Sequence, residues 1–325
     1  MGAGAVTPMT LRRLLLLFWI LCAVTPVAAE TADTSPTLPL LRVGFLRRED
    51  TGHPGEAQLE KLRDRLLQNN LFMRELWSSG FGGIGLYSCD GASDMIRRLG
   101  AREFDVAFTP AAIYMTATAN YSAILKTRRQ GDIVSPSNYV RRYGVVFVSS
   151  RSPLFGVADL TPELVRKNLA LDRIAVVSTQ SVAGFHAPLL TLRLKYGANR
   201  TQGGYLWFES SDEVVKGVLS GLADIGACEK QSLDETMKQE GLERERDKYV
   251  RVLAITDPVI TDPIVIRRDM PRQGALGRAL RREVRDYSLT GGLGEFQYVE
   301  ANDDEYRSLA QLLSEFDEKV GEVPR

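Results

Sequence analysis

The chain has 325 residues, of which 44% are hydrophobic and 25% are charged, and this composition excludes a disordered or collagen-like protein. Its 41 basic and 41 acidic residues balance, so bulk charge does not recruit nucleic acid or an anionic membrane. Two histidines and three cysteines leave little material for a multi-ligand metal site or for histidine-based catalysis, and we expect neither a metal nor a cofactor.

The first 29 residues have the form of a secretory signal peptide. Arg12 and Arg13 precede an apolar run over residues 14–24, and the small residues at 27–29 predict cleavage after Ala29. The apolar run is shorter than the ~20 residues that a membrane-spanning helix needs. We therefore expect an exported protein.

From residue 41 the chain alternates between short apolar strands and helices. A first series of strands is expected at 41–45, 84–87 and 105–108. A second series is expected at 144–148, 173–177, 205–208 and 225–227, and a further strand at 264–266 follows a turn-rich segment. Strands that alternate with helices predict parallel sheets covered by helices, which is an α/β fold.

Two series of the same kind predict two α/β lobes. The first part of lobe 1 is expected over residues 38–140 and lobe 2 over 141–255, and residues 256–325 are expected to return to lobe 1 and to end in helices. In such sheets ligands bind beyond the carboxyl ends of the strands, where helices begin. The residues directly after each strand are therefore the candidates for a binding site.

Several segments, in this order, resemble the periplasmic solute-binding proteins of phosphate, phosphite and phosphonate ABC transporters. The matching segments are 42–46, 104–114, 224–227, 253–258 and 262–269. The resemblance implies a type II-like periplasmic binding protein, with two α/β lobes that close about a hinge on a ligand in an interlobe cleft. It implies no catalysis, no nucleic acid and a membrane permease as partner.

The same resemblance points to particular binding residues. Members of the family usually hold the oxyanion with a Ser-Thr-Ser-Gly stretch at a helix N-terminus, and an ungapped alignment places Ser181, Val182, Ala183 and Gly184 there. Two hydroxyls are thus replaced by apolar groups, and each lost donor to an ionic ligand costs ~1.5–3 kcal/mol. Backbone N–H groups at the helix start could still hold an oxyanion, so phosphonate and other small oxyanions stay open as ligands.

Two further residues fall at family positions. Tyr114 lies where the family often places an aromatic side chain that lines the pocket, and helix packing is the alternative role. Asp212 replaces a histidine that is common in the family, and a helix N-cap is the alternative for this carboxylate. We expect both residues to contribute to the ligand site.

Cys89 and Cys228 each lie at the end of a predicted strand, one in each lobe. Thiolates favour soft centres, and a subset of the same family, the periplasmic arsenite-sensing proteins, acts on a membrane histidine kinase. This resemblance implies Cys89 and Cys228 as candidate metalloid ligands that meet in a closed cleft. Two alternatives stay open, namely free thiols that pack as small apolar groups and a disulfide in an oxidising compartment.

The main hypothesis is a monomeric, non-enzymatic periplasmic protein that closes on a small oxyanion or oxyacid and delivers it to an ABC transporter. The alternative is a periplasmic sensor that binds arsenite or another thiophilic ligand and signals to a histidine kinase.

Overall fold

The computed structural model describes residues 38–47, 54–129, 132–134, 140–169, 173–197, 204–285, 287, 289–291 and 294–321. The expected signal peptide lies outside these residues. Residues 38–325 form one compact unit, which is described here by itself. In the part of the chain that the structure describes, no helix is both long and apolar enough to cross a membrane.

The first lobe is built on a seven-stranded sheet in the order β14-β15-β4-β13-β3-β1-β2. Its strands are β1 (Leu40–Leu46), β2 (Gly83–Cys89), β3 (Val106–Phe108), β4 (Tyr121–Arg129), β13 (Pro263–Arg267), β14 (Leu289–Gly291) and β15 (Gly294–Glu300). β1 runs parallel to β2 and β3, whereas β13 lies antiparallel between β3 and β4. The sheet is therefore mixed, because the chain returns to it from the second lobe in the opposite direction.

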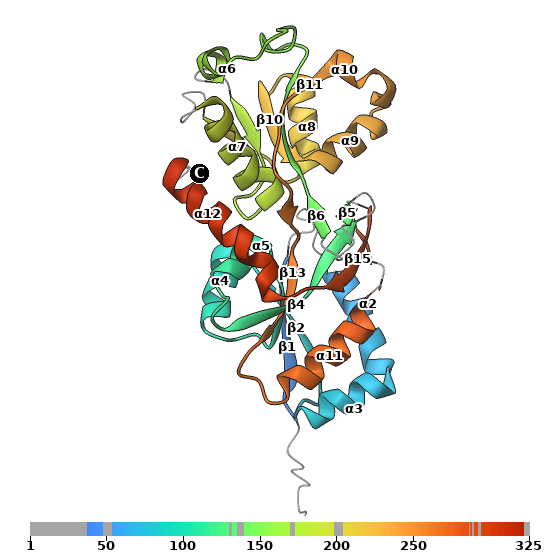
Figure 1. The fold of residues 1–325 in the computed structure, drawn as a ribbon. Helices are drawn as coiled ribbons and strands as arrows, with labels where there is room; N and C mark the ends of the chain where they lie inside the picture. The colour runs from blue at the N-terminus through green and yellow to red at the C-terminus, as the bar shows by residue number, and fades with distance from the viewer. Residues whose placement is uncertain are drawn as a thin grey trace, which may run out of the picture. The chain divides into compact units, whose positions relative to one another are not determined.

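Helices cover both faces of this sheet (Figure 1). One face carries α2 (Glu56–Gln68), α3 (Asn70–Ser78) and α11 (Gln273–Val284), and the other carries α4 (Ala92–Gly100), α5 (Ala111–Met115) and the first part of α12 (Arg307–Lys319). The apolar spacing of α2 explains its packing, because Leu59, Leu62 and Leu66 fall on one helical face and are buried against the sheet.

The second lobe is built on a five-stranded sheet in the order β11-β7-β10-β8-β9. Its strands are β7 (Gly144–Ser149), β8 (Ile174–Val176), β9 (Tyr205–Trp207), β10 (Ile225–Glu229) and β11 (Val250–Ile255). One face packs against α6 (Pro162–Leu169) and α7 (Ala187–Tyr196), and the other against α8 (Ser211–Ser220) and α9 (Lys230–Gln239). Every residue of β7 is buried, as expected of a strand that is covered on both faces.

The chain passes between the lobes through a small three-stranded sheet of β5 (Ile133–Val134), β6 (Val140–Arg142) and β12 (Val259–Ile260). We call residues 256–262, which include β12, the crossing segment. The short elements η1 (Val182–His186), η2 (Glu243–Glu245), α10 (Arg246–Tyr249) and η3 (Asp303–Tyr306) complete the described structure. The predicted fold, an α/β protein of two lobes, is confirmed.

Candidate functional site

A small cavity lies where the two lobes meet, and we call it the interlobe cavity. Its lining comes from Pro110 of the first lobe, from Arg142 and residues 260–262 between the lobes, and from residues 180–183 and Glu229 of the second lobe. Its volume is about 20 Å³, which is room for about one water molecule. It lies beyond the carboxyl ends of β3 and β8, where ligands of such sheets bind.

The second-lobe wall of the interlobe cavity is the start of a helix. The π-helical turn η1 (Val182–His186) continues directly into α7, and the Ser181 hydroxyl accepts a hydrogen bond of 2.9 Å from the Gly184 N–H. The first N–H groups of a helix have no partner inside it, so Ser181 satisfies one of them. A side chain at Gly184 would place its Cβ 2.6 Å from Val177, and only glycine fits there.

The two apolar residues at this helix start face packed surroundings. Val182 and Ala183 are each 5% exposed, and they belong to an apolar cluster that also contains Val259 and Ile260 of the crossing segment. The structure therefore places Ser181, Val182 and Ala183 in the lining of the interlobe cavity. Gly184 lies in the same turn, η1, but it is not part of the cavity lining.

Buried charges surround the interlobe cavity. Arg129, at the end of β4 in the first lobe, donates a hydrogen bond of 2.9 Å to Glu229, at the end of β10 in the second lobe. Arg142 donates to Asp132 at 3.1 Å, and its Nη1 lies 3.7 Å from Glu229. The side chains of the two arginines are only 2% and 5% exposed. Glu229 of the second lobe thus pairs with Arg129 of the first lobe and lies close to Arg142, which comes from the segment between the lobes.

The buried charges of Arg129 and Arg142 differ in how fully neighbouring carboxylates compensate them. Burial lowers the pKa of Arg129, whereas for Arg142 the effect of burial is outweighed by Asp132 and Glu229, which raise its pKa. Among the described residues, no hydrogen-bond partner approaches Nε and Nη2 of Arg129. Buried donors without an acceptor cost about 1–3 kcal/mol each, so this guanidinium would gain from an additional acceptor.

Asp262 lines the interlobe cavity beside a second helix start, which is the N-terminus of α5. Its Oδ1 accepts a hydrogen bond of 2.8 Å from the N–H of Ala111, the first residue of α5. The ionisable residues of the lining are therefore Arg142, Glu229 and Asp262, one positive and two negative. This balance suits a small ligand of low charge better than a doubly charged anion.

The two cysteines do not meet. Cys89 is 1% exposed and packs with Met95 and Phe104 in the core of the first lobe, and burial raises its pKa to about 11. Cys228 is fully buried in a separate core of the second lobe beneath α8 and α9, and burial raises its pKa well above the usual value. Both are free thiols.

The expectation that these thiols face a common cleft is therefore corrected. Successive residues of a strand point to opposite faces, so Cys228 enters the core while the next residue, Glu229, reaches the interlobe cavity. Glu229, and not Cys228, is therefore the residue of this pair that lines the interlobe cavity. The strand alternation of β10 was the signal that could have identified Glu229.

Tyr114 and Asp212 also lie apart from the cavity lining. Tyr114 is fully buried, its hydroxyl donates to Asp303 at 2.6 Å, and burial raises its pKa. It serves as a packing residue beneath η3. Asp212 lies in the first turn of α8, with its carboxylate 3.8 Å from the Lys216 amine, whereas Ser210 is the N-cap of that helix. The expected pocket roles of both residues are thus not met in this arrangement.

The described residues offer few ligands for a metal ion. Within those ranges, no group of three or more His, Cys, Asp or Glu side chains is placed to hold a metal ion. The chemistry available at the interlobe cavity is that of hydrogen bonds and charge.

Comparisons with known proteins agree with this geometry. Residues 86–306 match the family model described as "ABC transporter, phosphonate, periplasmic substrate-binding protein". No curated protein matches the chain. A solved binding protein component of an ABC phosphonate transporter from Pseudomonas aeruginosa is 14% identical, with a TM-score of 0.56 over 87% of this chain and 88% of that one.

Two further solved structures are similar. XAC2383 from Xanthomonas citri, bound to a chloride ion, is 18% identical, with a TM-score of 0.61 over 86% of this chain and 98% of that one. PhnD1 from Prochlorococcus marinus, in complex with methylphosphonate, is 16% identical, with a TM-score of 0.56 over the same shares, 86% and 98%. At these identities the likeness establishes the fold.

Proposed function

The chain belongs to the family of periplasmic substrate-binding proteins of phosphonate ABC transporters, and from this premise we propose that it closes its two lobes on a small oxyanion in the interlobe cavity. We propose further that it is exported with cleavage after Ala29, that it acts as a monomer without catalysis, and that it delivers its ligand to a membrane permease. The observation that carries the proposal is the convergence of a helix start, the buried Arg142 and the crossing segment on one cavity.

The ligand would be held mainly by backbone and by side-chain donors of the second lobe. The helix start offers the N–H groups of Val182 and Ala183, and Gln180 and Arg142 add side-chain donors from the cavity wall. Because the cavity is small and two carboxylates line it, the best ligand is compact and carries a single negative charge. Methylphosphonate, phosphite and phosphate in their singly charged forms have this charge. Each is larger than the single water molecule for which the cavity has room in this arrangement, so binding would also have to widen the cavity.

Closure is a population shift between an open and a closed arrangement of the lobes. The pair of Arg129 with Glu229 already joins the lobes in this structure, so the ligand would add to an existing attraction. A ligand that binds only the closed form stabilises the folded protein by ~2.7 kcal/mol at a hundred times its dissociation constant.

A thermal-shift and calorimetric screen of the purified protein tests this function. The probes are phosphate, phosphite, methylphosphonate, arsenate and arsenite, and we expect one of the phosphorus oxyanions to raise the melting temperature. Gln180→Glu should then lower the affinity by about tenfold or more, because it places a carboxylate against the anion. Gln239→Glu, an exposed substitution on α9, is the matched control. No shift with any oxyanion, or equal affinity in Gln180→Glu, would contradict the proposal.

An arsenite-sensing role has no comparable support. It needs Cys89 and Cys228 at one ligand, and these thiols are buried in separate cores with raised pKa values. The arsenite arm of the screen, run under reducing conditions, is therefore expected to give no shift.

A further inference from the structure

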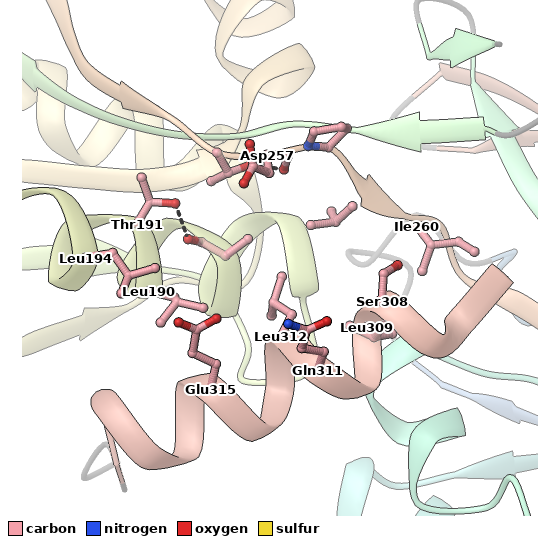
Figure 2. Close-up of a pocket in the computed structure, with 14 residues that line it drawn as sticks. Leu190, Thr191, Leu194, Asp257, Ile260, Ser308, Leu309, Gln311, Leu312 and Glu315 are labelled. Carbon is pink, nitrogen blue, oxygen red and sulfur yellow. Dashed lines mark hydrogen bonds between the residues drawn. The ribbon is translucent and has the colours of Figure 1, made fainter. Parts of the chain in front are cut away.

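A second cavity lies beside the crossing segment beneath the C-terminal helix, and we call it the α12 cavity. Its volume is about 240 Å³, far larger than that of the interlobe cavity. Three walls enclose it, formed by α7 of the second lobe, by residues 256–260 of the crossing segment and by α12 (Figure 2). It is therefore a separate space from the proposed oxyanion site, with only Ile260 common to both linings.

The floor of the α12 cavity is apolar. Leu190 of α7 and Leu309 of α12 are 6% and 2% exposed, and Leu312 lies beside them (Figure 2). Leu194 is 55% exposed although it lines the cavity, so one apolar wall is open to solvent. An organic group that covered Leu194 would remove this apolar surface from water, which is favourable at about 25 cal/mol per Å².

The charges of the lining all have one sign. Asp257 of the crossing segment and Glu315 of α12 lie on different walls, and both are lining residues (Figure 2). Among the described residues that line the α12 cavity, none is basic. Glu315 lies 3.9 Å from the amine of Lys319, which is outside the lining, and such an exposed pair is weak and easily replaced.

We propose that the α12 cavity binds a small organic cation with an apolar body, of the class of primary alkylammonium ions. The alkyl chain would lie on Leu190 and Leu312, and the ammonium group would lie in the negative field that Asp257 and Glu315 create from opposite walls. The Thr191 hydroxyl donates to the carbonyl of Ala187 at 2.8 Å, which leaves its oxygen able to accept a hydrogen bond from an ammonium group. The charge preference is opposite to that proposed for the interlobe cavity, so the two sites would take different ligands.

The test is a calorimetric and NMR titration of the full mature chain with pentylammonium, without any oxyanion. 1-Pentanol and pentanoate are the matched probes, because they keep the alkyl chain and remove or reverse the charge. We expect pentylammonium to bind at least about tenfold more tightly than 1-pentanol, and to shift the methyl resonances of Leu190 and Leu194. Equal affinity for pentylammonium and 1-pentanol, or resonance shifts elsewhere only, would overturn the proposal.

Variants separate the site from general surface charge. The double variant Asp257→Asn with Glu315→Gln should abolish the preference for pentylammonium over 1-pentanol. Glu318→Gln removes the same charge from an exposed position of α12 outside the cavity lining, and it should keep the preference. An unchanged preference in the double variant would overturn the proposal. Since this titration contains no oxyanion, its outcome is independent of the screen that tests the proposed function.

Discussion

Two contacts between the lobes are held by different kinds of interaction, one by charged side chains and the other by apolar packing. We call the contact of Arg129, Arg142, Asp132 and Glu229 the charged junction, and the contact of α12 with the second lobe the apolar junction. At the apolar junction Phe316 is 4% exposed, and its ring centroid lies 5.6 Å from that of Phe185 and 4.8 Å from that of His186.

The difference lies in what happens when one partner is lost. A buried ion pair is favourable only when every charge keeps its partner, so removal of one member leaves a charge that is costly to bury. An apolar contact loses only the area and the packing of the removed atoms. The charged junction can therefore respond to a ligand that brings or displaces charge, whereas the apolar junction holds α12 in place whatever the ligand is.

The largest expected effect is at the charged junction. Glu229→Ala should lower the free energy of unfolding by about 3–5 kcal/mol, because it leaves Arg129 and Arg142 without their shared carboxylate. Denaturant unfolding followed by circular dichroism measures this loss. Glu229→Gln keeps an acceptor and should cost less, and a loss below about 1 kcal/mol in Glu229→Ala would show that the junction is not held by charge.

The next effect is at the apolar junction. Phe316→Ala should cost about 3 kcal/mol in the same assay, since it empties a packed position between α12 and the second lobe. Phe316→Leu refills most of the volume and should cost less than half as much. If the two variants were equally unstable, ring contacts with Phe185 and His186 would matter more than volume.

A fall in pH should lower the stability of the protein through His186, which lies at the apolar junction. Burial lowers the pKa of His186 to about 4, and its Nδ1 has no hydrogen-bond partner among the described residues. The unfolded chain, with the ordinary histidine pKa of about 6.5, binds this proton first, so stability is complete above pH 6.5 and falls as the pH drops towards 4. The total loss is up to about 3 kcal/mol.

Unfolding free energies measured between pH 7 and 4 test this expectation. His186→Gln cannot take up the proton, and its stability should change less over this range than that of the wild type. Parallel curves for the two proteins would contradict the assignment of a buried, neutral His186.

The smallest effect concerns the helix start between the junctions. Ala183→Ser restores one hydroxyl of the family's oxyanion motif at the interlobe cavity, and it should raise the affinity for methylphosphonate by about tenfold, since a hydrogen bond to a charged group contributes about 1.5 kcal/mol. Calorimetry measures the gain. Ala187→Ser, at an α7 residue outside the lining of the interlobe cavity, is the control, and an equal gain there would refute a direct contact.

Much of this molecule was predictable from the sequence. The apolar runs of β1, β2, β3, β7 and β10 identified the strands, and the two series of strands and helices predicted the two lobes. β4 was not predicted, because its second half, 126–129, consists of polar residues, and three of them (Lys126, Thr127 and Arg129) are buried only through tertiary contacts.

The features that were missed or wrongly predicted at the site also depend on tertiary contacts. The pairing of Arg129 with Glu229 joins residues 100 positions apart, and no local pattern encodes such a contact. The assignment of the thiols to a cleft failed because the end of a strand does not state which face a side chain takes, and a shift of one residue exchanges the core for the cavity. The fold class can thus be predicted from the hydrophobic periodicity of the sequence. The site depends on the face of the strand to which each side chain points, and on contacts with residues that are distant in the sequence.

The order of the strands in the first sheet has a consequence for the way this chain acquires its structure. All strands of the second sheet lie between residues 144 and 255, whereas the first sheet needs β13, β14 and β15, which follow them in the chain. A chain that emerges from a translocation channel with its N-terminus first can complete the second lobe while the first still lacks three strands. The first lobe, with its distant strand pairs, is then expected to fold more slowly than the second.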